Sequence, residues 1–348
     1  MRGSRVAAPG IQPLGFPLRH IVRIVRIGAV SADSPTICPG LTLDFCGLGI
    51  GLPLSEQQKF QEATDAYQKA SALKPSAIFY WHQTLGFMDL KQWKDAEAAA
   101  NKGISLDPRN GRGYAILSAV FVKQRNSIEA ERLARKAINI DPGKMTEYWA
   151  LSHALNAQHK WIESVAVVRK IIDLAPQDGK AYVAIGYAWS QMEKFDEAIA
   201  NYRKAAELDA KNSSVYVHLG YALTKQHKTD EAVSVLKTAV AINPKDAIAH
   251  LNLGYALLEQ HKTDEAFTAF KATLGIKPDY ANAYDGFGRI YADRHDWTDA
   301  IAAFKKAIAL KADDRDAYIR LAACLRATGQ VAEAMATERK ITALGPPQ

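Results

Sequence analysis

A period of 34 residues governs this chain from residue 114 to residue 348. An aromatic residue returns at the same place in seven consecutive units, and no insertion or deletion separates them. A fixed period of about 20–50 residues is the signature of a solenoid, in which each unit buries its apolar side only against its neighbours. We therefore predict one elongated array instead of several globular domains. The recurring residues are Tyr114, Tyr148, Tyr182, Tyr216, His250, Tyr284 and Tyr318.

The pattern within each unit predicts two antiparallel helices joined by a short turn. In residues 179–212, apolar side chains recur at helical spacing in two runs, and the polar residues 190–194 separate the runs. Two columns of small residues indicate a close approach of the helices, since glycine inside a helix costs about 1 kcal/mol relative to alanine. These columns are Ser118, Ser152, Gly186, Gly220, Gly254, Gly288 and Ala322, and Ala130, Ser164, Ala198, Ala232, Ala266, Ala300 and Ala334.

Signals for helix ends recur with the same period. Proline ends the second helix of most units, because it lacks the amide proton and disfavours helical backbone in the residue before it. Near the start of one second helix, Asp230 and Glu231 are expected to cap exposed amides and to favour the positive end of the helix dipole. A column of large apolar residues is expected to complete the core: Ile140, Leu174, Leu208, Ile242, Ile276, Leu310 and Leu344.

The recurring columns resemble the tetratricopeptide repeat. The resemblance covers residues 56–348 and is specific, because many columns agree in phase. It implies an all-α fold, a right-handed α-α superhelix (solenoid) of about eight helix-turn-helix repeats with a concave groove. In one unit the family's positions are matched by Tyr182, Ile185, Gly186, Trp189, Ala198, Tyr202 and Ala205.

The same resemblance predicts the domain organisation. Residues 1–55 form a non-repeat N-terminal segment, and residues 56–348 form the array. Gly47, Gly49, Gly51 and Pro53 make residues 40–55 a poor helix, so the array is expected to begin with a second helix alone. The predicted units are a half repeat at 56–76 and full repeats at 77–110, 111–144, 145–178, 179–212, 213–246, 247–280, 281–314 and 315–348.

Residues 1–55 allow three interpretations. They carry five arginines against Asp33 and Asp44 and are rich in glycine and proline. A flexible tail or an incorrectly assigned start is one interpretation, and an organelle-type targeting segment is another. A secretory signal is the third, although Arg23 and Arg26 interrupt the apolar stretch that it requires. We expect a cytoplasmic protein, with organelle targeting or export through this segment as the alternative.

Charge and cysteine content argue against several classes of protein. The net charge is +7, and residues 56–348 carry 39 basic and 35 acidic side chains of alternating sign. Nucleic-acid binding favours a concentrated basic stripe, so we expect no nucleic-acid partner. No apolar run approaches the roughly 18 residues of a membrane span. Cys324 falls in a column of small apolar residues and should be buried, and Cys38 and Cys46 lack the second pair typical of zinc sites.

The sequence contains no motif typical of catalysis, cofactor binding or metal binding. We therefore predict that the protein is not an enzyme and takes no cofactor or metal. Four histidines share one position, but equivalent positions of neighbouring repeats lie too far apart for one ion, at about 10 Å per helix layer. We expect them to occupy the turn between helices in left-handed backbone, where Gly329 stands in the last unit. They are His159, His227, His261 and His295.

The resemblance places partner binding on the first helix of each repeat. In the family, the second, fifth, sixth and ninth positions of the unit face the groove. Aromatic residues with a polar tip are favoured at interfaces, so we predict a groove for an extended peptide or a partner helix. The alternative is that these residues pack between neighbouring first helices. The predicted groove residues are Trp149, His153, Val183, Tyr187, Val217, His218, Tyr221, Leu251, Asn252, Tyr255 and Arg289.

Two specific functions of the family fit poorly. The carboxylate clamp of its co-chaperones is not assembled, because Val217, Tyr221 and Gly286 stand at required positions near Asn252. The asparagine ladder of its sugar-transferring members is represented by Asn252 alone. We expect a non-catalytic scaffold or adaptor for protein or peptide partners. The alternative is a regulatory or targeting module of an enzyme system, such as a glycosyltransferase-type or chaperone-linked complex, with its catalyst on another chain. Glu338 suits a capped last repeat, with self-association through an array end as the alternative.

Overall fold

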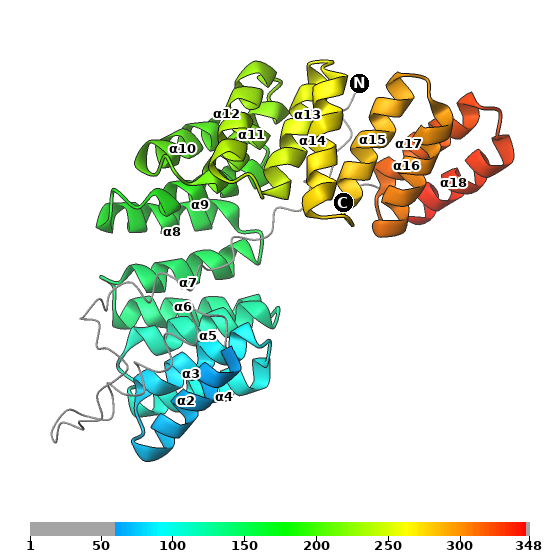
Figure 1. Ribbon diagram of the computed structural model, residues 1–348. Coiled ribbons are helices and arrows are strands. Elements are labelled where there is room, and N and C mark those ends of the chain that lie inside the picture. The colour runs from blue at the N-terminus through cyan, green and yellow to red at the C-terminus, as the bar shows by residue number, and fades with distance from the viewer. Residues whose placement is uncertain (1–59, 346–348) are drawn as a thin grey trace, which may run out of the picture. The chain divides into compact units, whose positions relative to one another are not determined.

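The computed structural model describes residues 60–345, which form helices α2 to α18 without a strand among them (Figure 1). These residues fall into two compact units, an N-terminal unit of residues 60–188 and a C-terminal unit of residues 189–345. The boundary lies inside α9 (Gly179–Gln191). The all-α class and the solenoid of helix pairs are thereby confirmed. Residues 1–55, with the predictions made for them, lie outside the described residues.

The N-terminal unit consists of helices that pack in chain order. Each first helix contacts the second helix of its own repeat, and α5 also contacts the first helix of the next repeat. The helices are α2 (Phe60–Leu73), α3 (Ala77–Asp89), α4 (Trp93–Leu106), α5 (Gly111–Lys123), α6 (Ser127–Ile140), α7 (Met145–Asn156), α8 (Trp161–Leu174) and the first part of α9.

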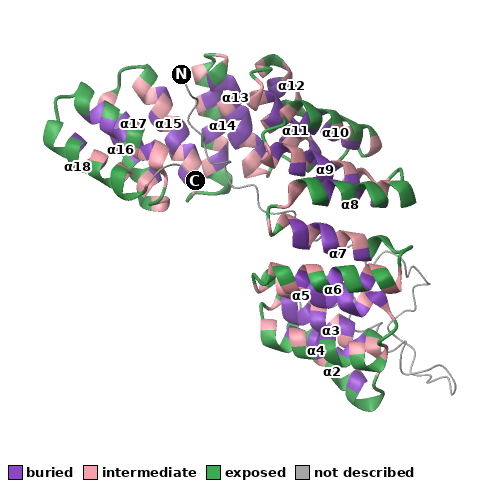
Figure 2. Cartoon of the chain, turned by 180° about the vertical axis from the view of Figure 1, so that it is seen from behind, coloured by how far each residue is buried: buried purple, intermediate pink, exposed green. Residues whose placement is uncertain are grey.

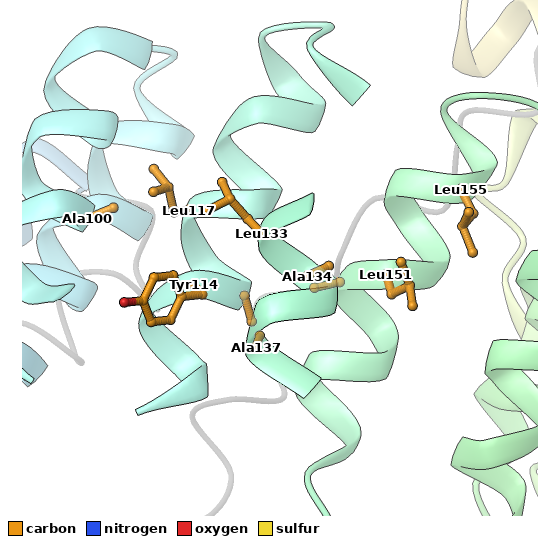
Figure 3. Packing of buried hydrophobic residues seen from close by; sticks show 10 residues of the cluster. Ala100, Tyr114, Leu117, Leu133, Ala134, Ala137, Leu151 and Leu155 are labelled. Carbon is orange, nitrogen blue, oxygen red and sulfur yellow. The ribbon is translucent and has the colours of Figure 1, made fainter. Parts of the chain in front are cut away.

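The core of this unit is shared between repeats. Figure 3 shows Tyr114 and Leu117 of α5 with Leu133 of α6 and Leu151 of α7 in one buried cluster. These four residues come from two successive repeats, and the cluster also includes Ala100 of the repeat before them, so no repeat would bury its apolar side alone. The two columns of small residues lie against each other between the helices of a repeat, as the sequence predicts. The Ser118 hydroxyl donates to the Ala130 carbonyl at 2.7 Å, across the two helices of one repeat.

The recurring tyrosines have a second role beyond the core. Tyr114 is buried, but the tyrosines that follow it are partly exposed and direct their hydroxyls to the loop before their own helix. In five of the repeats the tyrosine hydroxyl donates to the carbonyl of the residue six positions earlier, and the His250 ring nitrogen takes the same place in a sixth. This bond fixes the loop that joins one repeat to the next. The donors are Tyr114, Tyr148, Tyr182, Tyr216 and Tyr284, with His250.

The C-terminal unit continues the same alternation of helices. Figure 2 shows its buried residues along the sides of the helices that meet their neighbours. Its helices are the end of α9, α10 (Phe195–Leu208), α11 (Ser213–Lys225), α12 (Thr229–Ile242), α13 (Ala247–Glu259), α14 (Thr263–Ile276), α15 (Ala281–Asp293), α16 (Trp297–Leu310), α17 (Arg315–Ala327) and α18 (Val331–Ala343).

Glycines in the first helices make room for rings of the second helices. A Cβ atom at Gly254 would lie 2.6 Å from the Phe270 ring, and one at Gly288 would lie 2.6 Å from the Phe304 ring. The Phe270 ring also meets Gly286 of the next repeat, where a Cβ atom would lie 2.5 Å away. The predicted close approach is therefore confirmed, and its cause is a buried ring between two glycines.

The turn between the two helices of a repeat holds one residue in left-handed backbone. His159, His227, His261 and His295 have φ values of 58°, 57°, 59° and 63°. Gly329 takes this place in the last repeat with φ of 74°. These histidines are exposed, so the prediction that they serve the turn is confirmed.

Two expectations about helix ends and core need correction. The second helix α12 has Lys228 as its N-cap, with no side-chain hydrogen bond, so Asp230 and Glu231 favour the helix dipole without capping. Side-chain caps occur at Asp246 of the first helix α13 and at Asn126 of the second helix α6. The apolar column near the end of the second helices is half exposed. Leu174, Ile242, Ile276 and Leu344 have exposed fractions of 47%, 37%, 40% and 39%.

Gly254→Ala tests the ring-on-glycine packing. Alanine is the better helix former by about 1 kcal/mol, but the added methyl group would overpack the Phe270 ring at a cost of about 1–3 kcal/mol. We expect a lower midpoint in urea unfolding followed by circular dichroism. The matched control is Gly275→Ala in α14, whose Cβ atom would meet nothing within 4 Å, so this variant should be more stable. Equal stabilisation of both variants would contradict the packing.

Candidate functional site

The C-terminal unit carries an aromatic and charged surface on its first helices. Tyr221 of α11, Tyr255 of α13 and Arg289 of α15 stand at the ninth position of three successive repeats, and all three are partly exposed. We define the first-helix face by these residues and the polar side chains that adjoin them. Its members are Tyr221, Lys225, Tyr255, Asp285, Arg289 and Arg320.

Tyr255 connects successive first helices through its hydroxyl. The hydroxyl donates to the backbone carbonyl of Asn282 at 2.7 Å, and Oδ2 of Asp285 lies 3.3 Å from the same oxygen. The Asp285 carboxylate accepts from Nη1 of Arg320 at 2.9 Å. One chain of polar contacts therefore joins α13, α15 and α17, and it fixes the positions of these helices relative to one another.

Burial dominates the electrostatics of this network. Burial raises the pKa of Asp285, and the charges of Arg320 and Arg289 oppose that shift without cancelling it. Burial also raises the pKa of Tyr255 well above its usual value, so its hydroxyl keeps the proton that it donates. The Asp285 side chain is 10% exposed and the Arg320 side chain is 29% exposed. We conclude that this network fixes the position of Tyr255 within the first-helix face.

Two cations lie over tyrosine rings on the same face. Nζ of Lys225 is 5.6 Å from the centre of the Tyr221 ring, and Cζ of Arg289 is 5.4 Å from the centre of the Tyr255 ring. Burial raises the pKa of Tyr221 to about 12 and lowers the pKa of Lys225. Such cation–π contacts contribute about 0.5–1 kcal/mol at exposed sites, which favours these positions of the two cations.

Four of the predicted groove residues are buried within their own unit. Leu251 is 0% exposed, and Val183, Val217 and Asn252 are 7%, 6% and 7% exposed. These four pack inside their units, as the alternative interpretation has it. They lie beneath the partly exposed residues instead of offering a surface to a partner. The remaining residues are partly exposed, and their contact with a partner stays a prediction. They are Trp149, His153 and Tyr187 in the N-terminal unit and His218, Tyr221, Tyr255 and Arg289 in the C-terminal unit.

The N-terminal unit has aromatic pairs of its own on the predicted positions. The rings of Trp149 and His153 in α7 are 6.0 Å apart, and the rings of Trp161 and Tyr187 are 6.0 Å apart and nearly perpendicular. Burial lowers the pKa of His153 to about 4, so this histidine is neutral at physiological pH. The pair of Trp149 and His153 gives this unit an uncharged aromatic surface.

Sequence reasoning missed Lys225 of the first-helix face and the ion pair between Asp285 and Arg320, although these two residues stand at the fifth and sixth positions that the resemblance assigns to the groove. Lys225 stands at the thirteenth position of its repeat, outside the positions that the family resemblance supplies. Asp285 and Arg320 differ by 35 residues, one period plus one, and carry opposite charges. A search for opposite charges at one period plus or minus one residue would have found this pair.

Elsewhere in the described residues, fewer side chains are available to bind a ligand or a metal ion. A cavity of about 380 Å³ lies in the N-terminal unit between α6, α7 and α8, and Arg135 and Lys170 line it. Both cations already pair with acids, Arg135 with Glu131 at 2.7 Å and Lys170 with Asp173 at 3.3 Å. Between residues 60 and 345, no three potential metal ligands converge. Of the helices described, none has the length and apolar character that crossing a bilayer requires.

Comparisons with known proteins agree with this architecture. A sequence model described as TPR repeat matches residues 186–227 and 220–261, and one described as tetratricopeptide repeat matches residues 286–348. A search of curated proteins finds no match. A chain in the crystal structure of the APC/C hetero-tetramer Cut9-Hcn1 is 16% identical, with a TM-score of 0.58 over 88% of this chain and 74% of that chain. At this identity the likeness concerns the fold alone.

Two shorter structures match part of the chain. YrrB, described as a TPR protein with an unusual peptide-binding site, is 26% identical over 53% of this chain and 95% of that chain, with a TM-score of 0.43. MamA is 23% identical over 46% of this chain and 94% of that chain, also with a TM-score of 0.43.

Arg320→Met tests the ion pair between Arg320 and Asp285 within the first-helix face. The variant leaves the Asp285 carboxylate buried without its partner, which should lower the free energy of unfolding by roughly 2 kcal/mol near pH 7. Removing one partner of a fully buried ion pair costs about 3–5 kcal/mol, and the expected cost is smaller here because Arg320 is partly exposed. Adding Asp285→Leu, which copies Leu251 of the previous repeat, should restore most of the loss in urea unfolding. A double variant less stable than Arg320→Met would contradict this.

The pH dependence of stability tests the burial of His218. This histidine stacks on Tyr202 with ring centres 5.5 Å apart, and burial lowers its pKa from 6.5 to about 4. Between these values the unfolded chain binds more protons than the folded chain, so stability falls as the pH drops through this window. His218→Gln should therefore lose less stability than the unaltered protein between about pH 7.5 and about pH 4.5 in urea unfolding.

The control for this measurement is an exposed turn histidine. His261 has φ of 59°, which asparagine tolerates, so His261→Asn should fold normally. Its loss of stability between the two pH values should match that of the unaltered protein. If His218→Gln also matches the unaltered protein, partial burial does not lower the pKa of His218 as the structure has it.

Proposed function

The chain belongs to the tetratricopeptide-repeat family, and we propose that it is an interaction scaffold whose first-helix face binds an extended peptide or a partner helix. The repeat fold is generally a non-catalytic module for binding proteins, which supports the scaffold role. One observation carries the finer proposal. Tyr221 and Tyr255 lie partly exposed on successive first helices, each with a cation over its ring.

The chemistry of the face suits a protein segment. Tyrosine offers a large rigid contact area with a polar tip, and tyrosine and arginine are enriched among residues that dominate binding energy at interfaces. The hydrogen-bonded network of Tyr255, Asp285 and Arg320 holds this surface in place before binding. A pre-organised surface loses less side-chain freedom on association, which favours affinity.

The N-terminal unit carries a candidate binding surface of its own. Trp149, His153 and Tyr187 are partly exposed on α7 and α9 of that unit, and we propose that they bind an apolar part of the same or another partner. The buried Val183 lies about one helical turn before Tyr187 on α9 and packs beneath it.

We propose protein partners over nucleic acid because basic side chains of the second helices face acids of the next repeat. Arg203 lies 2.5 Å from Glu231, and Lys305 lies 2.6 Å from Glu333. Paired charges of this kind interrupt a basic stripe along these second helices, and a continuous stripe is what a phosphate backbone favours. We also propose that the chain has no catalytic role of its own and that Glu338, which pairs with Arg326 at 2.7 Å, limits self-association through the last repeat.

The joint variant Tyr221→Ala/Tyr255→Ala tests the proposed function. Truncation of two interface tyrosines should reduce the recovery of specific partners at least tenfold, since residues of this kind often cost about 2 kcal/mol or more. The measurement is affinity capture from cells that express the protein, followed by quantitative mass spectrometry. Circular dichroism must first show that the variant is folded.

Tyr280→Ala is the matched control for this experiment. Tyr280 is a partly exposed tyrosine of the same unit that precedes α15 and makes no side-chain cap there. Its truncation should leave the captured proteins unchanged. Equal capture by all three proteins would contradict binding on the first-helix face. Recovery of an enzyme among the tyrosine-dependent partners would instead favour the alternative, a regulatory or targeting module.

A further inference from the structure

One side of α18 is uncovered among the described residues. Figure 1 shows α18 at the outer end of the C-terminal unit, where it packs against α17. On α10, α12, α14 and α16, the first helix of the following repeat packs on the second helix, as α17 packs on α16. The corresponding side of α18 is therefore a surface of the kind that receives a first helix elsewhere in this unit.

Met335 belongs to this surface, because its counterparts in earlier repeats are buried. Met335 is 51% exposed, but Ile301 at the same position of the previous repeat is 8% exposed. Ile301 belongs to one buried cluster with Leu321 and Leu325 of the first helix that follows it. Met335 therefore has a side chain suited to such a contact and no described helix to make it with. The same position is also buried in three other repeats, by Val165, Ile199 and Val233.

Two more apolar side chains of the last repeat are exposed. Ile319 of α17 is 42% exposed, whereas Val217 at the same position of an earlier repeat is buried in one cluster with Ala249 of the next first helix. Val331 of α18 is 52% exposed and lies one helical turn before Met335 on the same side of the helix. A partner that covered these side chains would remove apolar surface from water, which favours association.

Arg339 adds a positive charge to this side of α18, four residues after Met335. In four earlier repeats, the basic residue at its position pairs with an acid 28 residues later, in the first turn of the next second helix. Arg339 is exposed, and it forms no ion pair with any residue from 60 to 345. Its Nε donates only to the carbonyl of Met335, at 3.4 Å. We define the terminal face by Ile319, Val331, Met335 and Arg339. The four pairs are Arg135 with Glu163, Arg203 with Glu231, Lys237 with Glu265 and Lys305 with Glu333.

The acids of α18 argue against a second copy of this chain as the partner. Glu333 pairs with Lys305 at 2.6 Å, and Glu338 pairs with Arg326 at 2.7 Å. A second copy that used the same face would therefore bring another Arg339 and no unpaired acid of α18 to meet it. A chain that supplies an acid of its own complements the charge of the terminal face better.

We infer that the terminal face binds a helical hairpin of a different protein. The first helix of this hairpin carries apolar residues four positions apart that pack on Met335, and an acid in the first turn of its second helix pairs with Arg339. The packing of the last repeat on α16 is the internal example, because Leu321, Leu325 and Glu333 make these contacts there. This inference goes beyond the proposed function, since it assigns a second partner surface made of other residues than the first-helix face.

Photo-crosslinking from α18 tests this inference on the full chain. The variant Met335→p-benzoylphenylalanine is expressed in cells that express the protein, and mass spectrometry identifies the residues joined to it after irradiation. The expected product contains a helix of a different protein, with apolar residues four positions apart and an acid in the helix that follows. The matched control is Ile276→p-benzoylphenylalanine at the end of α14, where the replaced side chain is 40% exposed, and it should not give this product.

The decisive readout is a charge exchange between the two proteins. The crosslinked partner is purified, and its dissociation constant from the full chain is measured by fluorescence anisotropy. Met335→Gln should weaken binding about tenfold, and Ile276→Gln should leave it unchanged. Arg339→Glu should weaken binding about fivefold or more, because it places two acids opposite each other, and a lysine in place of the partner's acid should restore most of the loss. All three positions are exposed, so circular dichroism should show unchanged folding.

Three results would overturn the inference. A crosslink to a second copy of this chain would show that the terminal face serves self-association. A partner whose binding does not recover on charge exchange would show that Arg339 does not pair with its acid. A yield of crosslinks no higher than that of the Ile276 control would show that nothing covers the terminal face. Each of these leaves the proposed function to its own test, because Tyr221 and Tyr255 lie outside the terminal face.

Discussion

The packing of second-helix rings onto first-helix glycines is the constraint on which the rest of the C-terminal unit depends. The Phe270 ring lies between Gly254 of its own repeat and Gly286 of the next, so it sets the distance between α13 and α15. The Tyr255 ring meets Phe270 edge-on, with ring centres 5.2 Å apart. The hydroxyl of Tyr255 can then reach the start of α15. The core contact therefore positions the first-helix face.

Much of the fold could be predicted from the sequence because the repeat makes weak local signals add up. One histidine says little by itself, but histidines separated by one or two periods of 34 residues marked the left-handed turn at His159, His227, His261 and His295. The glycine column marked close approach for the same reason. The hydrogen bonds of the tyrosine hydroxyls could not be predicted in this way. Spacing along the sequence indicates that a residue faces the core, but the contact of Tyr148 with the Pro142 carbonyl depends on three-dimensional loop geometry.

The site was less predictable, because position in a repeat determines which helix carries a residue but not how far it is exposed. Val217 and Leu251 share the side of the helix predicted for the groove, yet they are buried. Lys225 lies outside the positions given by the resemblance and becomes visible only through its contact with Tyr221. Asp285 interrupts an apolar column, and its partner Arg320 is on another repeat. The sequence therefore shows neither that Asp285 is buried nor that Arg320 pairs with it.

Hydrogen–deuterium exchange of the full chain, with and without a bound partner peptide, tests the central claim most directly. Slower exchange in α11, α13 and α15, with α12, α14 and α16 unchanged, is the result expected if the partner lies on the first helices of the C-terminal unit. Protection that falls on the second helices instead, or that leaves the C-terminal unit unchanged, would contradict the account.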